Sequence, residues 1–193
     1  HYLYHILKQL YLKECEKKML KLTNKLLGTK SEPWDFENPP MDPQKLFQDM
    51  VKIMMDKKAL GLSAIQVGIP YRVFIFGNYY DEKEIYSAFN PKIVDFGSEM
   101  KYYDEGCLSF PGIFCKIKRH TEIRARFSDW QNNTDTFKFR EVTAQVFQHE
   151  YDHLEGVTFR QRANRIHWQK AKKEKLKLDR LRKKNEREKR TFI

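Results

Sequence analysis

The chain has 193 residues, of which 40% are hydrophobic and 33% charged, and its formal net charge is +11. This length fits one domain with a single core plus an appendage. No stretch of about 18 apolar residues occurs, which excludes a membrane-spanning helix and any membrane partner that needs one. The three cysteines are too few for a disulfide framework, so we expect a reducing compartment. Lysines and glutamates interrupt the opening stretch, which argues against a secretory signal and favours a cytoplasmic protein, or an organellar one in a eukaryote.

The excess positive charge lies in the C-terminal tail. Residues 160–193 contain 15 Lys and Arg against 4 Asp and Glu, a surplus equal to the net charge of the whole chain. A one-sided charge of this density attracts polyanions such as nucleic acid. The alternative is a solvated helix that binds nothing.

Helical patterns occur at both ends of the chain and at two internal positions. Residues 1–27 are rich in Leu, Lys and Glu without Gly or Pro, and residues 28–43 then predict a loop. Asp42 and Pro43 form a good helix start, and an apolar stripe predicts that this helix runs to about Ala59. Further helices are predicted over residues 142–154 and from residue 165 onward.

Between these helices lie stretches rich in β-branched and aromatic residues. Strands are predicted over residues 71–76, over 87–96 with a break at Asn90-Pro91, over 113–127 as one or two strands, and over 136–139. The predicted fold class is α+β, with small antiparallel sheets around a central metal-binding helix and a basic C-terminal helix.

The most informative stretch is Gln148–His153, which reads Q-H-E-Y-D-H. On a helix, His149 and His153 share one face, so both imidazoles can bind one metal ion. Glu150 follows the first histidine and can handle a proton of water activated by that metal. The spacing alone does not identify a particular hydrolase, and the alternative is a surface helix with two solvated histidines.

A second unusual stretch, Glu105–Ser109, reads E-G-C-L-S and offers Cys107 as a third ligand. A free cysteine is most often a small buried hydrophobe. A thiolate with two imidazoles, however, leaves a fourth position for water, which is the layout of a catalytic metal. Cys15 and Cys115 have no such neighbours, so we expect them to be structural.

Three stretches resemble, in order and at similar spacing, the motifs of the peptide deformylases. They are Gly61-x-Ser63-Ala64-x-Gln66, Glu105-Gly106-Cys107-Leu108-Ser109 and Gln148-His149-Glu150-x-Asp152-His153. The second and third match the family pattern completely. In the first, Ala59 replaces a glycine and Ser63 replaces an alanine. We expect these changes to affect fine substrate contacts rather than activity. The resemblance covers about residues 23–159 and implies a catalytic domain over residues 23–164, between a helical extension over 1–22 and the basic tail over 165–193.

The resemblance implies a metal-dependent hydrolase that removes the N-formyl group from the initiator methionine of nascent polypeptides. Cys107, His149 and His153 would hold one divalent metal ion. In the family this is typically Fe(II), while nickel or cobalt also works and zinc is often poorer. Sulfur and nitrogen ligands suit all of these, so any of them is expected in a purified sample.

The resemblance also assigns a role to each catalytic group. The metal lowers the pKa of bound water, and the resulting hydroxide attacks the formyl carbon. Glu150 takes the proton and later delivers it to the leaving amine. The Gln66 side-chain amide and the Leu108 backbone N–H stabilise the negative charge that develops on the formyl oxygen.

The methionine side chain needs an apolar slot beside the metal, which Tyr103 would close, and the peptide backbone would add as a strand. Glu105 either pairs with Arg119 behind the metal loop or makes an ordinary surface contact. Asp152 is expected to contact a histidine or a neighbouring cation rather than the metal. The residues expected to bind the substrate are Leu60, Gly61, Leu62, Tyr103, Glu105, Gly112, Val142 and Val146.

The basic tail resembles, in charge and position, a C-terminal helix by which bacterial family members dock on the ribosome. It therefore predicts contact with ribosomal RNA, by a chain that we expect to be monomeric.

Two other functions stay open. An H-E-x-x-H zinc peptidase would take a third ligand downstream, such as Glu174, but would leave Cys107 and Gln66 without roles. A non-catalytic ribosome-binding adaptor with a vestigial metal site is opposed by the intact Glu150, Gln66 and Cys107.

Overall fold

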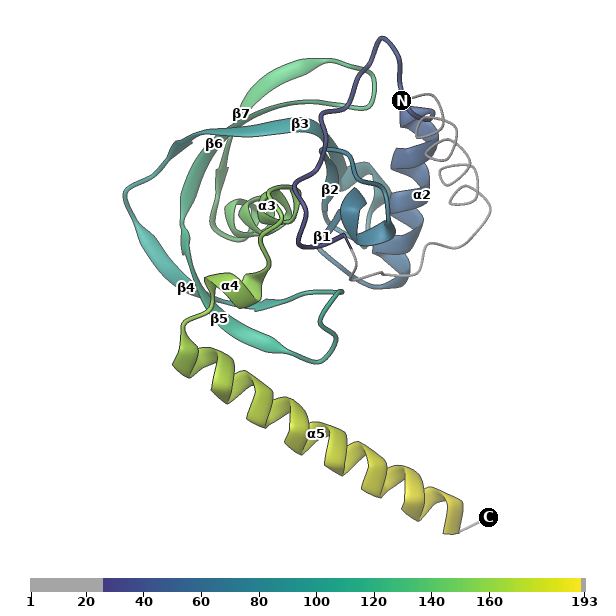
Figure 1. Cartoon of the computed structure of the whole chain (residues 1–193), viewed down its shortest axis with the longest axis vertical. Coiled ribbons are helices and arrows are strands. Elements are labelled where there is room, and N and C mark those ends of the chain that lie inside the picture. The colour runs from purple at the N-terminus through teal and green to yellow at the C-terminus, as the bar shows by residue number, and fades with distance from the viewer. Residues whose placement is uncertain (1–25, 192–193) are drawn as a thin grey trace.

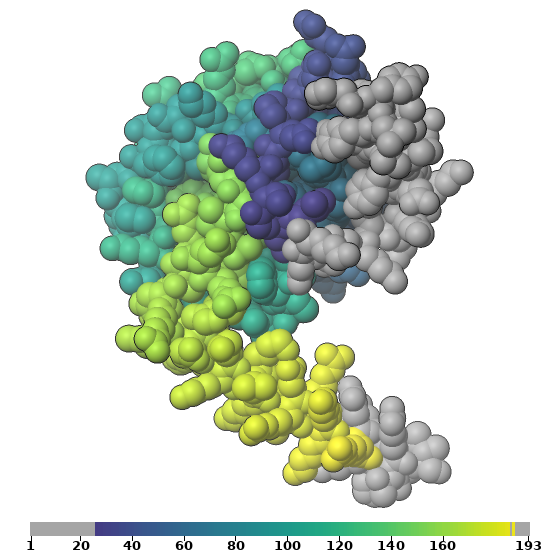
Figure 2. All heavy atoms as spheres, in the orientation of Figure 1, coloured from purple at the N-terminus to yellow at the C-terminus, as the bar shows by residue number. Residues whose placement is uncertain are grey.

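The computed structural model describes residues 26–191. The helical extension expected over residues 1–22 therefore lies outside the described residues. Helix α3 (Glu141–Leu154) runs through the middle of the body, with strands curving around it (Figure 1). Helix α5 (Arg165–Thr191) leaves the body at its lower end, and Figure 2 shows it extending away from the rest of the molecule. These two helices are the central helix and the basic helix that the sequence predicts.

Two antiparallel sheets surround α3. The larger has the strand order β1-β2-β3-β6-β7, and the smaller is the hairpin β4-β5. The strands are β1 (Gly61–Ser63), β2 (Val73–Gly77), β3 (Ile85–Phe96), β4 (Met100–Gly106), β5 (Phe114–His120), β6 (Glu122–Ser128) and β7 (Thr134–Arg140). The α+β class with small antiparallel sheets is confirmed.

Some strand predictions are refined by the structure. Residues 113–127 form two strands, β5 and β6, and the break expected at Asn90-Pro91 is an irregularity within the single strand β3. Asn90 has a φ of 49°, and the pairing of β3 with β6 shifts register on either side of Lys92. The sequence missed β1, which has only three residues, and β4, whose charged residues give no alternating apolar pattern.

Helix α2 (Pro43–Asp56) begins as predicted, because the Asp42 carboxylate accepts hydrogen bonds from the next two free backbone N–H groups. It ends earlier than Ala59, since Lys58 adopts a φ of 51° and stops the helical hydrogen bonding. Its apolar face packs against β1 and β2, and Met50 and Met54 on this face are fully buried. These methionines are core residues, and they fix the place of β1 beside α3.

Helix α3 is buried on two faces, one apolar and one carrying polar side chains. One face carries Ala144 and Phe147 into an aromatic cluster on the large sheet. Another face carries the two histidines and the glutamate of its H-E-x-x-H stretch, which are also buried. The short helix α4 (Phe159–Arg162) and α5 follow it. No helix within residues 26–191 is long and apolar enough to cross a membrane.

Candidate metal centre

Three potential metal ligands meet between α3 and the loop after β4. Cys107 follows the end of β4, while His149 and His153 lie one helical turn apart on α3. One donor atom from each residue lies within 4.8 Å of the others. Sγ of Cys107 and Nε2 of His153 are 3.3 Å apart. Folding therefore brings the three residues of two distant motifs to one point, as the sequence predicts.

The two histidine rings are prepared for metal binding in different ways. Nδ1 of His149 is 2.9 Å from Oε2 of Glu105, so this carboxylate fixes the ring and leaves Nε2 for a metal. His153 is completely buried, and burial lowers its pKa well below the usual value. Its ring is therefore neutral, as a metal ligand must be.

The electrostatics at His149 favour a positive charge between this ring and Cys107. Burial opposes a charged ring, but hydrogen bonds to Cys107 and Glu105 outweigh it and raise the pKa of His149 to about 10. A divalent cation would supply that charge in place of the ring proton. One thiolate and two imidazoles fit Fe(II), Zn, Ni or Co and leave an open position, so the donor set suits a catalytic metal.

Glu150 lies next to the three donors and is almost completely buried. Ser63 Oγ donates a hydrogen bond of 2.5 Å to Glu150 Oε2 and a longer one to the Glu150 backbone oxygen. Burial raises the pKa of the Glu150 carboxyl, and the nearby charge of His149 and the Ser63 hydroxyl counteract it. A carboxyl with a raised pKa is suited to accept and return a proton near neutral pH.

Gln66 lies in the short 3-10 helix η1 (Ala64–Val67), which begins directly after β1. Its Oε1 accepts a hydrogen bond from the Ser63 backbone N–H, at 2.9 Å. This contact orients the amide, so Nε2 donates toward Ser109 Oγ at 3.1 Å and Cys107 Sγ at 3.5 Å. The backbone N–H of Leu108 donates to no acceptor within residues 26–191. Two donors thus lie beside the candidate metal ligands.

A network of buried charges stands behind His149. Arg119 donates two hydrogen bonds to Glu105 and a third to Asp152, which also receives two from Arg162. Of the two alternatives left open for Glu105, the structure shows the pair with Arg119, which is buried and is not a surface contact. Asp152 contacts neighbouring cations, as expected for a residue that does not bind the metal itself.

A cavity of about 680 Å³ opens beside the three donors. Among the residues expected to bind substrate, Leu60, Gly61, Glu105, Gly112 and Val146 line it, although the Glu105 carboxylate is turned toward Arg119 and His149. The sequence did not point to several further lining residues, because nothing in their spacing links them to the metal motifs. These are Gln145, Phe110, Ile113 and Phe114.

Three expected substrate residues lie elsewhere. Leu62 points into the core, because successive side chains of a strand alternate between faces. Tyr103 does not line the cavity, and its hydroxyl donates a hydrogen bond to Glu141. Val142 is half exposed and lines a neighbouring pocket instead. Val142 therefore lines only the neighbouring pocket, whereas Val146, one helical turn further on, also lines the metal cavity.

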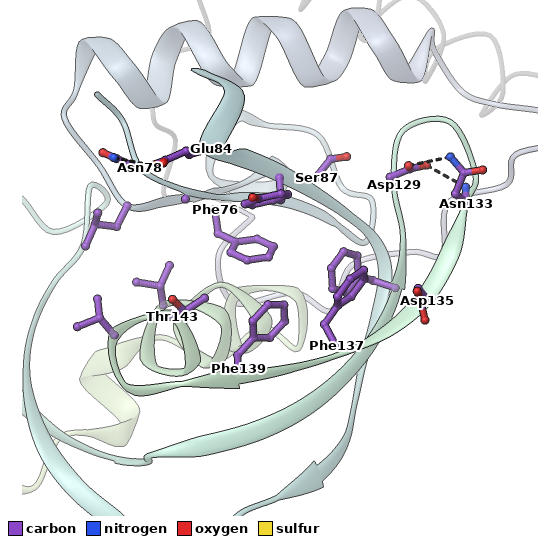
Figure 3. A pocket seen from close by; sticks show the side chains of 16 residues that line it. Phe76, Asn78, Glu84, Ser87, Asp129, Asn133, Asp135, Phe137, Phe139 and Thr143 are labelled. Atoms are coloured by element: carbon purple, nitrogen blue, oxygen red, sulfur yellow. Dashed lines mark hydrogen bonds between the residues drawn. The ribbon is translucent and has the colours of Figure 1, made fainter. Parts of the chain in front are cut away.

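That neighbouring pocket has a volume of about 800 Å³ and lies between α3 and the large sheet. Figure 3 shows that the rings of Phe76, Phe137 and Phe139 line it, with Thr143 of α3 on the same side of the pocket as Phe139. Leu60 and Val146 line both hollows, so these two side chains form the wall between the aromatic pocket and the metal cavity.

Comparison with known proteins gives a consistent result. A family model described as polypeptide deformylase matches residues 16–169. A peptide deformylase of Pelagibacter ubique is 37% identical over 145 residues, covering 74% of this chain and 83% of that protein. One of Novosphingobium aromaticivorans is 35% identical over 159 residues, covering 72% of this chain and 83% of that protein.

Solved structures agree with the sequence relatives. A peptide deformylase of Plasmodium falciparum matches with a TM-score of 0.75 and 28% identity, over 86% of this chain and 97% of that one. A peptide deformylase of Legionella pneumophila matches with a TM-score of 0.74 and 28% identity, over 86% and 96% of the two chains.

Proposed function

The chain belongs to the polypeptide deformylase family, and on that basis we propose that it removes the formyl group from the N-formylmethionine of nascent polypeptides. The observation that carries this proposal is the convergence of Cys107, His149 and His153 beside a cavity that Glu150 and Gln66 also line. The division into segments 1–22, 23–164 and 165–193 belongs to the same proposal.

In this proposal Cys107, His149 and His153 hold one divalent ion, which is Fe(II) in the cell. Such an ion supplies an activated water near neutral pH and polarises the formyl carbonyl. Glu105 supports the arrangement, because its bond to Nδ1 of His149 keeps Nε2 directed away from the carboxylate.

Glu150 is the proposed proton carrier. Its carboxylate accepts a proton from the attacking water and returns it to the amine that leaves, so the methionine ends with a free amino group. Burial supports this role because it raises the pKa of the carboxyl, and Ser63 supports it by fixing Oε2.

Gln66 and Leu108 are the proposed donors to the formyl oxygen. Negative charge develops on this oxygen when the formyl carbon becomes tetrahedral, and oriented N–H groups stabilise that charge without moving. The fixed amide of Gln66 supports this assignment, as does the backbone N–H of Leu108, which donates to no acceptor in the described part of the chain.

Leu60 and Val146 are the proposed walls of the methionine slot, since both side chains line the metal cavity. Strand β1 is an edge strand of the large sheet, so its outer side can pair with an extended peptide through the backbones of Gly61 and Leu62. Gly112 would contact the peptide from the opposite side. Tyr103 and Val142 would contribute only at the edge of the slot.

The experiment that tests this function is an anaerobic assay of formyl-Met-Ala-Ser, with the metal content measured on the same sample. Wild type should release formate, whereas Glu150→Ala should keep its metal and lose nearly all turnover. A metal-loaded wild type that leaves the formyl peptide intact would refute the proposal. Cleavage of an unformylated internal peptide bond would instead favour a peptidase, and ribosome binding without either activity would favour an adaptor.

We also propose that α5 docks on the ribosome by contacting phosphates of ribosomal RNA. The helix carries most of the surplus positive charge, and Leu176, Leu178 and Leu181 remain exposed on it. The proposed setting is a compartment in which translation starts with formylmethionine, the bacterial cytoplasm or an organelle, and the proposed state is a monomer.

Cosedimentation with ribosomes tests the tail. The full chain should bind more tightly than a chain ending at Trp168, and the difference should shrink steeply as salt rises. Equal binding by both forms at low salt would discard the docking role.

A further inference from the structure

We propose that Arg162 is a positioning residue for the metal centre, acting on His149 through a relay of three buried side chains. The proposal rests on the proposed function only in taking His149 as a metal ligand. Arg162 is the last residue of the short helix α4, which lies between α3 and the basic helix α5.

The relay is continuous and made of charged hydrogen bonds. Arg162 holds both oxygens of Asp152, through Nη2 at 2.6 Å and Nε at 3.0 Å. Asp152 accepts a bond of 2.5 Å from Arg119, which grips Glu105 with two bonds of 2.8 and 3.0 Å. Glu105 contacts Nδ1 of His149 at 2.9 Å. Paired contacts of this kind fix orientation as well as distance.

Arg162 supplies a second guanidinium to a relay that contains two buried carboxylates. Arg119 faces two carboxylates, Glu105 and Asp152, and all three side chains are at most 7% exposed. A buried carboxylate needs a paired cation, because it has lost its hydration. Without Arg162, therefore, Asp152 would compete with Glu105 for the single guanidinium of Arg119.

Helix α4 also reaches His149 from a second direction. The ring of Phe159 lies against the His149 ring with centroids 6.1 Å apart, and Trp168 of α5 makes an edge contact with Phe159 at 5.8 Å. A capping box between Thr158 and Gln161 fixes the start of α4. Since the start of α4 is anchored, Arg162 at its end is held where it can support Asp152.

Loss of Arg162 has two opposite effects, and their difference in sign makes the proposal testable. Removing a positive charge near a cation would by itself strengthen metal binding. The Arg162 side chain is 52% exposed, however, so solvent screens this effect. Loss of orientation at His149 instead weakens binding, and the groups that hold a metal ligand typically contribute about 10–100-fold in affinity.

The test compares Ni(II) affinity and the rate of Ni(II) release to a chelator in the full-length protein. Arg162→Ala should bind Ni(II) about tenfold more weakly and release it correspondingly faster. Arg162→Lys keeps the charge but loses the paired contact, and it should fall between wild type and Arg162→Ala. Arg160→Ala is the matched control, because Arg160 lies on the same helix but stacks over Trp168 outside the relay; it should behave as wild type.

A double-mutant cycle identifies the path. In an Asp152→Asn background, adding Arg162→Ala should change Ni(II) affinity by less than about twofold, since Arg162 would act through that carboxylate. The visible absorption spectrum of the Co(II) form should change in Arg162→Ala and not in Arg160→Ala, which a general loss of stability would not produce.

Unchanged or tighter Ni(II) binding by Arg162→Ala would overturn the proposal. So would an equal effect of Arg162→Ala in the Asp152→Asn background. These outcomes do not depend on turnover: a wild type that binds Ni(II) but does not deformylate refutes the proposed function while leaving the relay to be judged by metal affinity alone.

Discussion

Gly61 and Glu150 lie so close together that a methyl group on Gly61 would stand 2.6 Å from Oε1 and 2.8 Å from Cγ of Glu150. Real side chains do not approach so closely, so the absence of a side chain at position 61 is what lets Glu150 occupy its place. Gly61 of the first motif thus determines where Glu150 of the third motif can lie. Strand β1 is the surface against which Glu150, the proposed proton carrier, packs.

Gly61→Ala should therefore lower kcat/KM for formyl-Met-Ala-Ser by about a hundredfold, because a displacement of about 1 Å at a reacting group has an effect of this size. Metal content should stay at the wild-type level, since the atoms nearest to the added methyl belong to Glu150 and not to the three donors. Steady-state kinetics with metal analysis on the same preparation checks this. Activity within threefold of wild type would show that Glu150 tolerates the shift.

Ser63→Ala tests a second contact between β1 and Glu150. The substitution removes the hydroxyl that donates to Glu150 Oε2 but keeps the backbone N–H that holds Gln66. A hydrogen bond to a charged group is worth about 1.5–3 kcal/mol, which corresponds to about 10–150-fold. Because alanine is the family residue here, we expect a loss of about tenfold, at the lower end of that range. A larger loss than that of Gly61→Ala would contradict this order.

Gln66→Glu tests the proposed oxyanion donors. The substitution keeps the shape of the side chain but replaces the Nε2 donor, which faces Ser109 and Cys107, by a carboxylate oxygen. Loss of one such donor typically costs about 3 kcal/mol, so kcat should fall about 100-fold or more while KM changes little. A rise in KM with kcat nearly unchanged would point to a role in ground-state binding instead.

The two histidine ligands and the central helix can be predicted well from the sequence, because both depend on local spacing. His149 and His153 are one turn apart in any helix, so a shared face follows from the helix alone. Cys107 lies far from them in the chain, and no local rule pairs it with two histidines. The family resemblance supplied that pairing. Contacts such as that of Ser63 with Glu150 cannot be predicted from the sequence, because they join residues of separate elements.

Cys107 and Cys115 should differ sharply in their effect on metal retention. Cys107→Ser should lose most of its bound metal after dialysis against a chelator, because a hydroxyl is a far poorer ligand than a thiolate for the metals concerned. Cys115→Ser, on the adjacent strand β5, should retain it, because Cys115 is buried in an apolar cluster and is not one of the three converging donors. Metal-to-protein ratios of the two variants check this.

Metal removal should also lower the melting temperature of wild type, because a ligand that binds only the folded state stabilises it. Chelator treatment should leave the melting temperature of Cys107→Ser nearly unchanged. Equal shifts in wild type and Cys107→Ser would mean that the stabilising metal binds somewhere else.

The substrate slot is the part of the site that the sequence predicts least well, and the reason is geometric. Helical spacing places Val142 and Val146 on one face, but it does not say that the wall formed by Leu60 and Val146 divides that face between two hollows. Likewise, the position of Tyr103 in β4 depends on a strand with no apolar alternation. Such features arise from how separate elements pack, and single-sequence patterns do not encode them.

The different positions of Val142 and Val146 relative to this wall lead to a last prediction. Val146→Phe should narrow the metal cavity and raise KM for formyl-Met-Ala-Ser at least tenfold, because one or more methylenes that no longer fit cost about 1–3 kcal/mol. Val142→Phe adds the same volume on the aromatic-pocket side of the wall, so KM should change less than threefold. Formyl-Gly-Ala-Ser, which has no side chain to place, should lose little with either variant. If Val142→Phe raised KM for the methionine peptide as much as Val146→Phe, the methionine side chain would have to cross the wall into the aromatic pocket.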